Sequence, residues 1–99
     1  MKVEVTDGAR ADLQAIHGFL CQRSEVCAHR TLQRITRRMR QLETFPLSGR
    51  EMSEYGYVQV RELVEAPYRI AYHVLPDRVR ILFVIHGSAD LREESGSSE

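Results

Sequence analysis

The sequence has no tryptophan, only two cysteines and three prolines, and no excess of charge of either sign. It also lacks any apolar run approaching the roughly 18 residues needed to cross a membrane. Glu4 comes early and no apolar stretch precedes a small-residue cleavage site, so no signal peptide is expected. We therefore expect a cytoplasmic protein without membrane association, in which Cys21 and Cys27 stay reduced.

The remaining composition is that of an ordinary globular domain. The 99 residues are 42% apolar and 28% charged, and a chain of this length forms one domain. Residues 92–99 contain three glutamates, serines and a glycine but no apolar side chain. We predict a single domain over residues 1–91 and a disordered C-terminal tail over residues 92–99.

Apolar patterns in the first half of the chain predict a strand followed by two helices. Residues 1–6 alternate between apolar and polar side chains, as in a half-buried strand. Apolar residues then recur at helical spacing in two segments, at Ala9, Leu13, Ile16 and Leu20 and at Ala28, Leu32, Ile35, Met39 and Leu42. Thr6 or Asp7 and Ser24 are suitable N-caps. The short break between the segments predicts a helical hairpin.

From residue 57 the apolar period changes to two, which predicts three strands. They cover residues 57–64, 68–75 and 79–86, and the last is apolar on nearly both faces, as in the interior of a sheet. Strands joined by such tight turns are antiparallel. The predicted fold class is α+β, with an N-terminal strand, a two-helix hairpin and a three-stranded antiparallel meander. Together the strands would form a four-stranded sheet covered by the hairpin.

Four side chains of metal-binding type lie close together in the sequence. They are His17, Cys21, Cys27 and His29, which is the number of ligands in a tetrahedral zinc site. Their spacing fits no known structural site, and Cys27 and His29 would point about 200° apart on a helix. Reduced cysteines and surface histidines are the favoured interpretation, so no metal is expected. The sequence has no nucleophile elbow, phosphate loop or dinucleotide motif, so no cofactor is expected.

The zero net charge conceals an uneven distribution. The 14 basic and 14 acidic side chains balance overall, yet residues 21–50 carry a net charge of +5 and residues 92–99 carry −2. Arg30, Arg34 and Arg37 share one face of the second predicted helix, with Arg38 at its margin. This pattern indicates a surface for an acidic partner or a phosphate backbone, or simply a solvated helix face. The neutral total disfavours nucleic-acid binding through bulk charge alone.

A second polar group lies on the predicted sheet. Arg61 and Arg69 fall on strands expected to be neighbours, and His86 ends the last strand. With a carboxylate from the preceding loop, Glu51 or Glu54, they would suit acid–base cleavage of a phosphodiester. Alternatively, both arginines are surface residues paired with one of three nearby acids, Glu62, Glu65 or Glu4.

Five short motifs, in order along the chain, resemble those of the RelE/ParE toxins. They are Ala9-x2-Asp12-Leu13-x2-Ile16, Leu42-x3-Pro46-x2-Gly49-Arg50, Val60-Arg61-Glu62-Leu63, Tyr68-Arg69-Ile70-x-Tyr72 and Val84-x-His86-Gly87-x2-Asp90-Leu91. The resemblance extends from about residue 3 to residue 91, nearly the whole chain. The family fold is similar to the strand, hairpin and meander predicted above.

The resemblance implies the toxin of a bacterial type II toxin–antitoxin system, neutralised by a ParD-like antitoxin that lies across an apolar groove. The loop motif and the closing motif look more like the ParE branch, whose members inhibit DNA gyrase and have no known catalytic residues. RelE-type members instead cleave messenger RNA on the ribosome. A ParE-like inhibitor would be no enzyme and would make no direct sequence-specific contact with nucleic acid.

Two alternatives to the gyrase inhibitor stay open. One is a RelE-like ribosome-dependent endonuclease, with Arg69, His86 and Glu51 as its catalytic residues. The other is an inactive member that only binds the antitoxin, because Ala89 stands where the ParE ending usually has arginine. The residues expected to contact the antitoxin are basic or aromatic, namely Arg34, Arg37, Arg38, Arg61, Tyr68 and Arg69.

Overall fold

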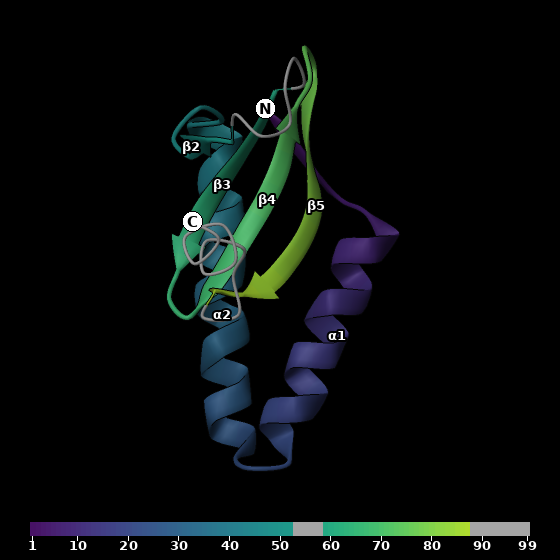
Figure 1. The fold of residues 1–99 in the computed structure, drawn as a ribbon, viewed down its shortest axis with the longest axis vertical. Helices are drawn as coiled ribbons and strands as arrows, with labels where there is room; N and C mark the ends of the chain where they lie inside the picture. Colours follow the sequence, from purple (N-terminus) through teal and green to yellow (C-terminus); the bar gives the residue numbers. More distant parts are fainter. Residues whose placement is uncertain (53–58, 88–99) are drawn as a thin grey trace, which may run out of the picture.

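The structure is a computed structural model that describes residues 1–52 and 59–87 (Figure 1). Several predictions fall outside these residues. They concern the tail over residues 92–99, Glu54 of the polar loop, Ala89 in the closing motif, and the start of the strand predicted from residue 57.

Seven elements follow one another as a strand, two helices and four strands. Their bounds are β1 Lys2–Val5, α1 Asp7–Cys21, α2 Glu25–Thr44, β2 Arg50–Glu51, β3 Val60–Glu65, β4 Tyr68–Val74 and β5 Arg78–His86. The α+β class, the hairpin and the meander are confirmed. Within the described residues, however, the sheet has five strands rather than four, because β2 pairs with β3. A two-residue strand is too short to show an alternating pattern.

Both helices begin at the capping side chains expected from the sequence. The Thr6 hydroxyl accepts a hydrogen bond from the Ala9 amide (3.2 Å), and the Ser24 hydroxyl accepts one from the Cys27 amide (3.1 Å). Packed against each other, α1 and α2 form a hairpin that extends beyond the sheet in Figure 1. Neither of these two helices, which belong to the described residues, is long and apolar enough to cross a membrane.

The strand order in the sheet is β1-β5-β4-β3-β2. The pairs β3–β4 and β4–β5 are antiparallel, whereas β1 runs parallel to β5. Parallel pairing is possible because the long chain between β1 and β5 returns to the same end of the sheet. β5 lies between β1 and β4, which explains the apolar residues on both of its faces.

The main core lies between the helices and one face of the sheet. From α2, Ile35 and Leu42 are fully buried, and they share a cluster with Ile70 and Tyr72 of β4. Leu32, which the periodicity places in the α2 stripe, is only partly buried. The other face of the sheet carries a smaller buried cluster of Met52, Val60 and Ala71.

A β-bulge interrupts the pairing of β4 with β5. Ala71 pairs with Phe83 and the next residue, Tyr72, pairs with Ile81, so Leu82 is an extra residue on β5. The bulge shifts the alternation of side chains between the two faces of β5. Ile81 and Val84, which both join the core beneath the helices, are therefore three residues apart and not two. Periodicity read from a continuous apolar run does not show such a shift.

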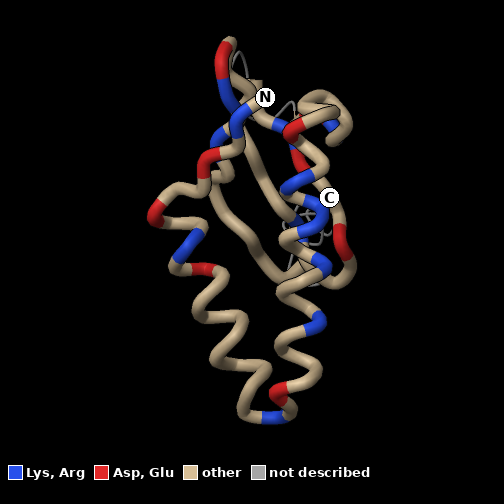
Figure 2. The backbone as a smooth tube through the Cα atoms, turned by 180° about the vertical axis from the view of Figure 1, so that it is seen from behind, with Lys and Arg blue, Asp and Glu red and all other residues tan. Residues whose placement is uncertain are grey.

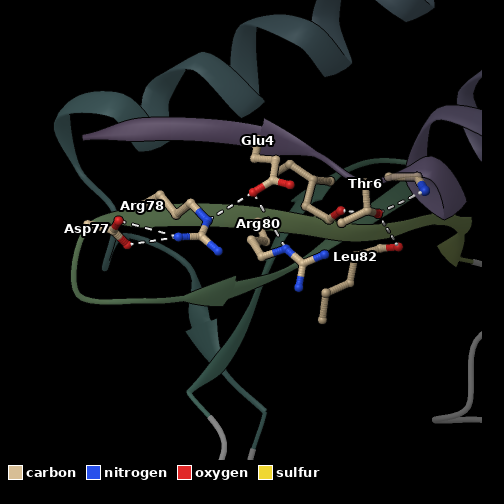
Figure 3. A network of polar contacts seen from close by, with 8 residues as sticks. Glu4, Thr6, Asp77, Arg78, Arg80 and Leu82 are labelled. Atoms are coloured by element: carbon tan, nitrogen blue, oxygen red, sulfur yellow. Dashed lines mark hydrogen bonds and ion pairs between the residues drawn. The ribbon is translucent and has the colours of Figure 1, made fainter.

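Two side chains at the start of the helical hairpin bind the backbone around this bulge. The Asp12 carboxylate accepts a hydrogen bond from the Val84 amide (2.9 Å), and the Thr6 hydroxyl donates one to the Ile81 carbonyl (2.6 Å). Figure 3 shows Thr6 also reaching the carbonyl of Leu82. Asp12 therefore ties α1 to β5, which accounts for its place in the first motif.

Replacing Asp12 with alanine removes the acceptor of the Val84 amide. We expect the free energy of unfolding in urea to fall by about 1–3 kcal/mol, because a partly buried donor loses its partner. Asp12→Asn keeps an acceptor oxygen and should lose less. Gln14→Ala, at an exposed position of the same helix, is the control and should change stability by less than about 0.5 kcal/mol. Wild-type stability in Asp12→Ala would contradict this role.

Candidate functional site

A buried carboxylate joins three strands on the face of the sheet away from the helices. The Glu62 side chain of β3 is only 3% exposed. Arg50, directly opposite on β2, places Nη2 2.5 Å from Glu62 Oε2. Arg69 of β4 places its own Nη2 2.6 Å from the same oxygen. These ion pairs therefore cross β2, β3 and β4.

The two arginines keep Glu62 ionised. Burial by itself raises the pKa of the Glu62 carboxyl, but hydrogen bonds from Arg50 and Arg69 and their positive charges outweigh it. The net effect lowers the pKa below its ordinary value of 4.5. A buried carboxylate needs such partners, because desolvation otherwise favours its neutral form. At neutral pH Glu62 is thus a counter-charge for both guanidinium groups.

The loop after α2 is attached to the sheet by Arg61 and Tyr72. Arg61 Nη1 donates to the Gly49 carbonyl (2.8 Å), and Nη2 lies 3.4 Å from the Glu51 carboxylate. The buried Tyr72 hydroxyl accepts a hydrogen bond from the Gly49 amide (2.8 Å). A Cβ at Gly49 would lie 2.5 Å from that hydroxyl oxygen and 2.7 Å from the Glu62 carbonyl oxygen. Only glycine fits here, which explains the Gly-Arg pair of the loop motif.

At the end of β3, a second glutamate binds α2. Glu65 lies 3.2 Å from Arg34 Nε and 3.3 Å from Arg38 Nε. Arg38 also donates to the Val64 carbonyl (3.3 Å) and to the side chain of Gln41 (2.7 Å). Arg34 and Arg38 are therefore used to hold the helix against the edge of the sheet.

Glu4, a third possible partner of the sheet arginines, is engaged elsewhere. Its carboxylate on β1 lies 3.0 Å from Arg78 Nε and 3.7 Å from Arg80 Nε, both on β5 (Figure 3). Of the pairings considered from the sequence, Arg69 with Glu62 is therefore present, whereas Arg61 pairs with Glu51.

The structure does not bring the three predicted nuclease residues together. Glu51 faces Arg61, and Arg69 binds Glu62. His86 packs edge-on against Tyr68, with ring centroids 5.4 Å apart and planes at 81°. Arg69 is next to Tyr68 in β4, and Tyr68 is the strand partner of His86, so Arg69 and His86 point to opposite faces. Glu51 on β2 and His86 on β5 are separated by three inter-strand spacings and by four residues along the strand direction. This corresponds to about 20 Å between their backbones.

The possible metal ligands form a pair and not a larger group. Cys21 Sγ lies 3.5 Å from Nε2 of His17, one turn earlier in α1. In residues 1–52 and 59–87, no three His, Cys, Asp or Glu side chains are arranged to hold a metal ion. The thiols of Cys21 and Cys27 are free.

The comparisons with known proteins agree with this architecture. The family model of the ParE toxin of the type II toxin–antitoxin system parDE matches residues 3–91. The chain belongs to the ParE toxin family. A solved structure titled "Chromosomal ParDE TA system from P. aeruginosa" is similar in fold, with a TM-score of 0.70 and 23% sequence identity over 87% of this chain and 95% of that one. No curated protein matches the chain.

In this ParE-family chain, most residues predicted to contact an antitoxin have internal partners. Arg34, Arg38, Arg61 and Arg69 lie in ion pairs, and Tyr68 is buried. Arg37 is exposed on α2. The family motifs therefore include many residues that hold the ParE fold together.

The sequence pattern identifies Glu62 only as one possible ion-pair partner of the sheet arginines and does not reveal its central position. The available signal was a glutamate between apolar residues of a strand, Val60 on one side and Leu63-Val64 on the other. A charged residue at an inward position of a strand needs a buried partner. The identity of that partner depends on the pairing with β2, which the sequence pattern does not show.

Glu62→Gln tests the buried ion pairs of this ParE-family chain. At pH 7 we expect a loss of about 3 kcal/mol in unfolding free energy, because two arginines lose a buried counter-charge. The folded-state pKa of Glu62 lies below its ordinary value of 4.5, so the ion pairs stabilise the fold above that pH. The difference between wild type and variant should therefore shrink as pH falls from about 4.5 through the lowered pKa.

The matched control is Glu51→Gln. Glu51 is on neighbouring β2 and has a side chain 67% exposed, so its loss should cost no more than about 1 kcal/mol at pH 7. Chemical denaturation at several pH values measures both variants. A constant difference between wild type and Glu62→Gln across the acid range would contradict the assignment.

Proposed function

We propose that this ParE-family chain inhibits DNA gyrase by binding to it, without catalysing a reaction, and that a ParD-like antitoxin neutralises it in the cytoplasm. The observation that carries the proposal is the family match over residues 3–91. It extends from Val3 within β1 past the end of β5, so the motifs and the fold belong to one toxin family.

The geometry of the sheet supports binding over catalysis. Nuclease action would need a base, an acid and a cation around one phosphodiester. Glu51 and His86 lie about 20 Å apart, and Arg69 is committed to the Glu62 carboxylate. A protein surface requires no such convergence, because its affinity is distributed over many contacts.

The antitoxin part of the proposal follows from the family, which is that of toxins from parDE systems. A toxin of this kind is made together with a protein that silences it. The uneven charge of the chain, +5 over residues 21–50, gives an acidic partner a surface to approach.

A supercoiling assay with purified gyrase tests the target. We expect supercoiling of relaxed plasmid to fall as the toxin concentration rises, while transcripts in a parallel cell-free translation reaction stay intact. Cleaved transcripts, with cleavage lost in Arg69→Ala, would instead identify a ribosome-dependent endonuclease. Unaffected supercoiling together with intact transcripts would identify an inactive, antitoxin-binding member.

Neutralisation is tested in the same assay. The protein encoded beside the toxin gene, purified alone, should restore supercoiling. Restoration should be complete once the molar ratio of this protein to the toxin equals their ratio in the purified complex. A control protein of similar size and acidity should leave inhibition unchanged. Persistent inhibition with a saturating amount of the neighbouring protein would contradict its role as the antitoxin.

A further inference from the structure

Four of the five arginines of α2 fall into two pairs with different surroundings. Arg34 and Arg38 face the sheet and bind Glu65. Arg37 and Arg40 are exposed and, among the described residues, form no ion pair and no side-chain hydrogen bond. In Figure 2, basic positions follow α2 along much of its length. A partner can therefore bind Arg37 and Arg40 without competing with an ion pair among the described residues, whereas at Arg34 and Arg38 it would compete with Glu65.

A groove follows this exposed side of α2. It has a volume of about 410 Å³ and is lined by His29, Leu32, Gln33, Thr36, Arg37 and Arg40. The lining includes two guanidinium groups and no carboxylate, although α2 also carries Glu25 and Glu43. From His29 to Arg40 the helix rises about 16 Å. The groove therefore combines positive charge with enough length for several residues of a partner.

The lining also indicates the class of the occupant. Leu32 is partly buried and, with the methyl group of Thr36, gives the groove an apolar strip that a sugar–phosphate backbone would not use. A peptide would cover this strip with apolar side chains and place carboxylates on Arg37 and Arg40. The zero net charge of the chain likewise disfavours a polyanion that binds through long-range attraction.

We propose that this groove receives an acidic segment of the antitoxin. The inference rests on the proposed function and names the surface used. About 16 Å corresponds to three turns of helix or about five extended residues. Carboxylates of the antitoxin segment would contact Arg37 and Arg40. The side-chain amide of Gln33 would form a hydrogen bond with the same segment, and an apolar side chain of the segment would cover Leu32. Arg34 and Arg38 contribute indirectly, because they hold α2 in place.

Charge reversal with a matched control tests the groove. In Arg37→Glu/Arg40→Glu, affinity for the neighbouring-gene protein in 50 mM salt should fall at least tenfold, measured by calorimetry. Arg10→Glu/Arg30→Glu makes the same change of net charge at exposed positions outside the groove, and affinity should change by less than twofold. Equal losses in both double variants would show that only overall charge matters, and would overturn the proposal.

A variant that keeps the charge separates steric from electrostatic effects. Thr36→Trp fills the groove at an exposed helix position, so the fold should persist, as circular dichroism would verify. We expect a loss of affinity of about tenfold with an unchanged salt dependence, since every charge is retained. Wild-type affinity in this variant would overturn the proposal.

Two further outcomes separate the groove from the proposed function. If the neighbouring-gene protein binds wild type, Arg37→Glu/Arg40→Glu and Thr36→Trp equally, the antitoxin uses another surface and the groove assignment fails alone. If that protein does not bind wild type at all, the antitoxin part of the proposed function fails as well. A 15-base-pair DNA duplex serves as a third probe. If it binds wild type and Arg37→Glu/Arg40→Glu abolishes that binding, the occupant of the groove is a nucleic acid and the proposed acidic peptide is wrong.

Discussion

The buried ion pairs of Glu62 are the interaction on which the rest of the sheet depends. One carboxylate oxygen binds Arg50 of β2 and Arg69 of β4, while Glu62 itself lies on β3. Breaking this arrangement would take a buried carboxylate away from two guanidinium groups, one of which, on Arg69, is itself only 14% exposed. The same region includes Gly49, whose lack of a side chain lets Tyr72 approach the loop backbone. Charge pairing and close packing thus fix the same edge of the fold.

This constraint changes how the basic residues of the sheet are understood. Arginine beside histidine and glutamate suggests a nuclease, yet Arg69 is bound to a buried carboxylate and His86 packs on Tyr68 from the other face. Arg61 and Arg69 of β3 and β4 thus stabilise the fold, whereas Arg37 and Arg40 of α2 are exposed and form no ion pair among the described residues. A toxin that acts by binding is compatible with such a division, because its sheet can be rigid while its helix face meets partners.

The helical hairpin and the sheet are joined by polar contacts as well as by the core. Asp12 binds the backbone beside the β5 bulge, and Glu65 binds Arg34 and Arg38 of α2. Each contact has one partner from the first half of the chain and one from the second. They set the position of α2 on the sheet, and with it the direction in which Arg37 and Arg40 face.

The sequence alone determined the α+β class, the hairpin, its caps and the order of the meander, because periodicity and capping are local properties. It also showed the concentration of arginine between residues 21 and 50. Tertiary structure decided the rest. The fifth strand, the bulge at Leu82 and the partners of Glu62 depend on contacts between distant segments. The position of Glu65 likewise decided which arginines of α2 are left for a partner. Helical periodicity places Arg34 and Arg37 on one face, but it contains no information about the strand that packs beside that face.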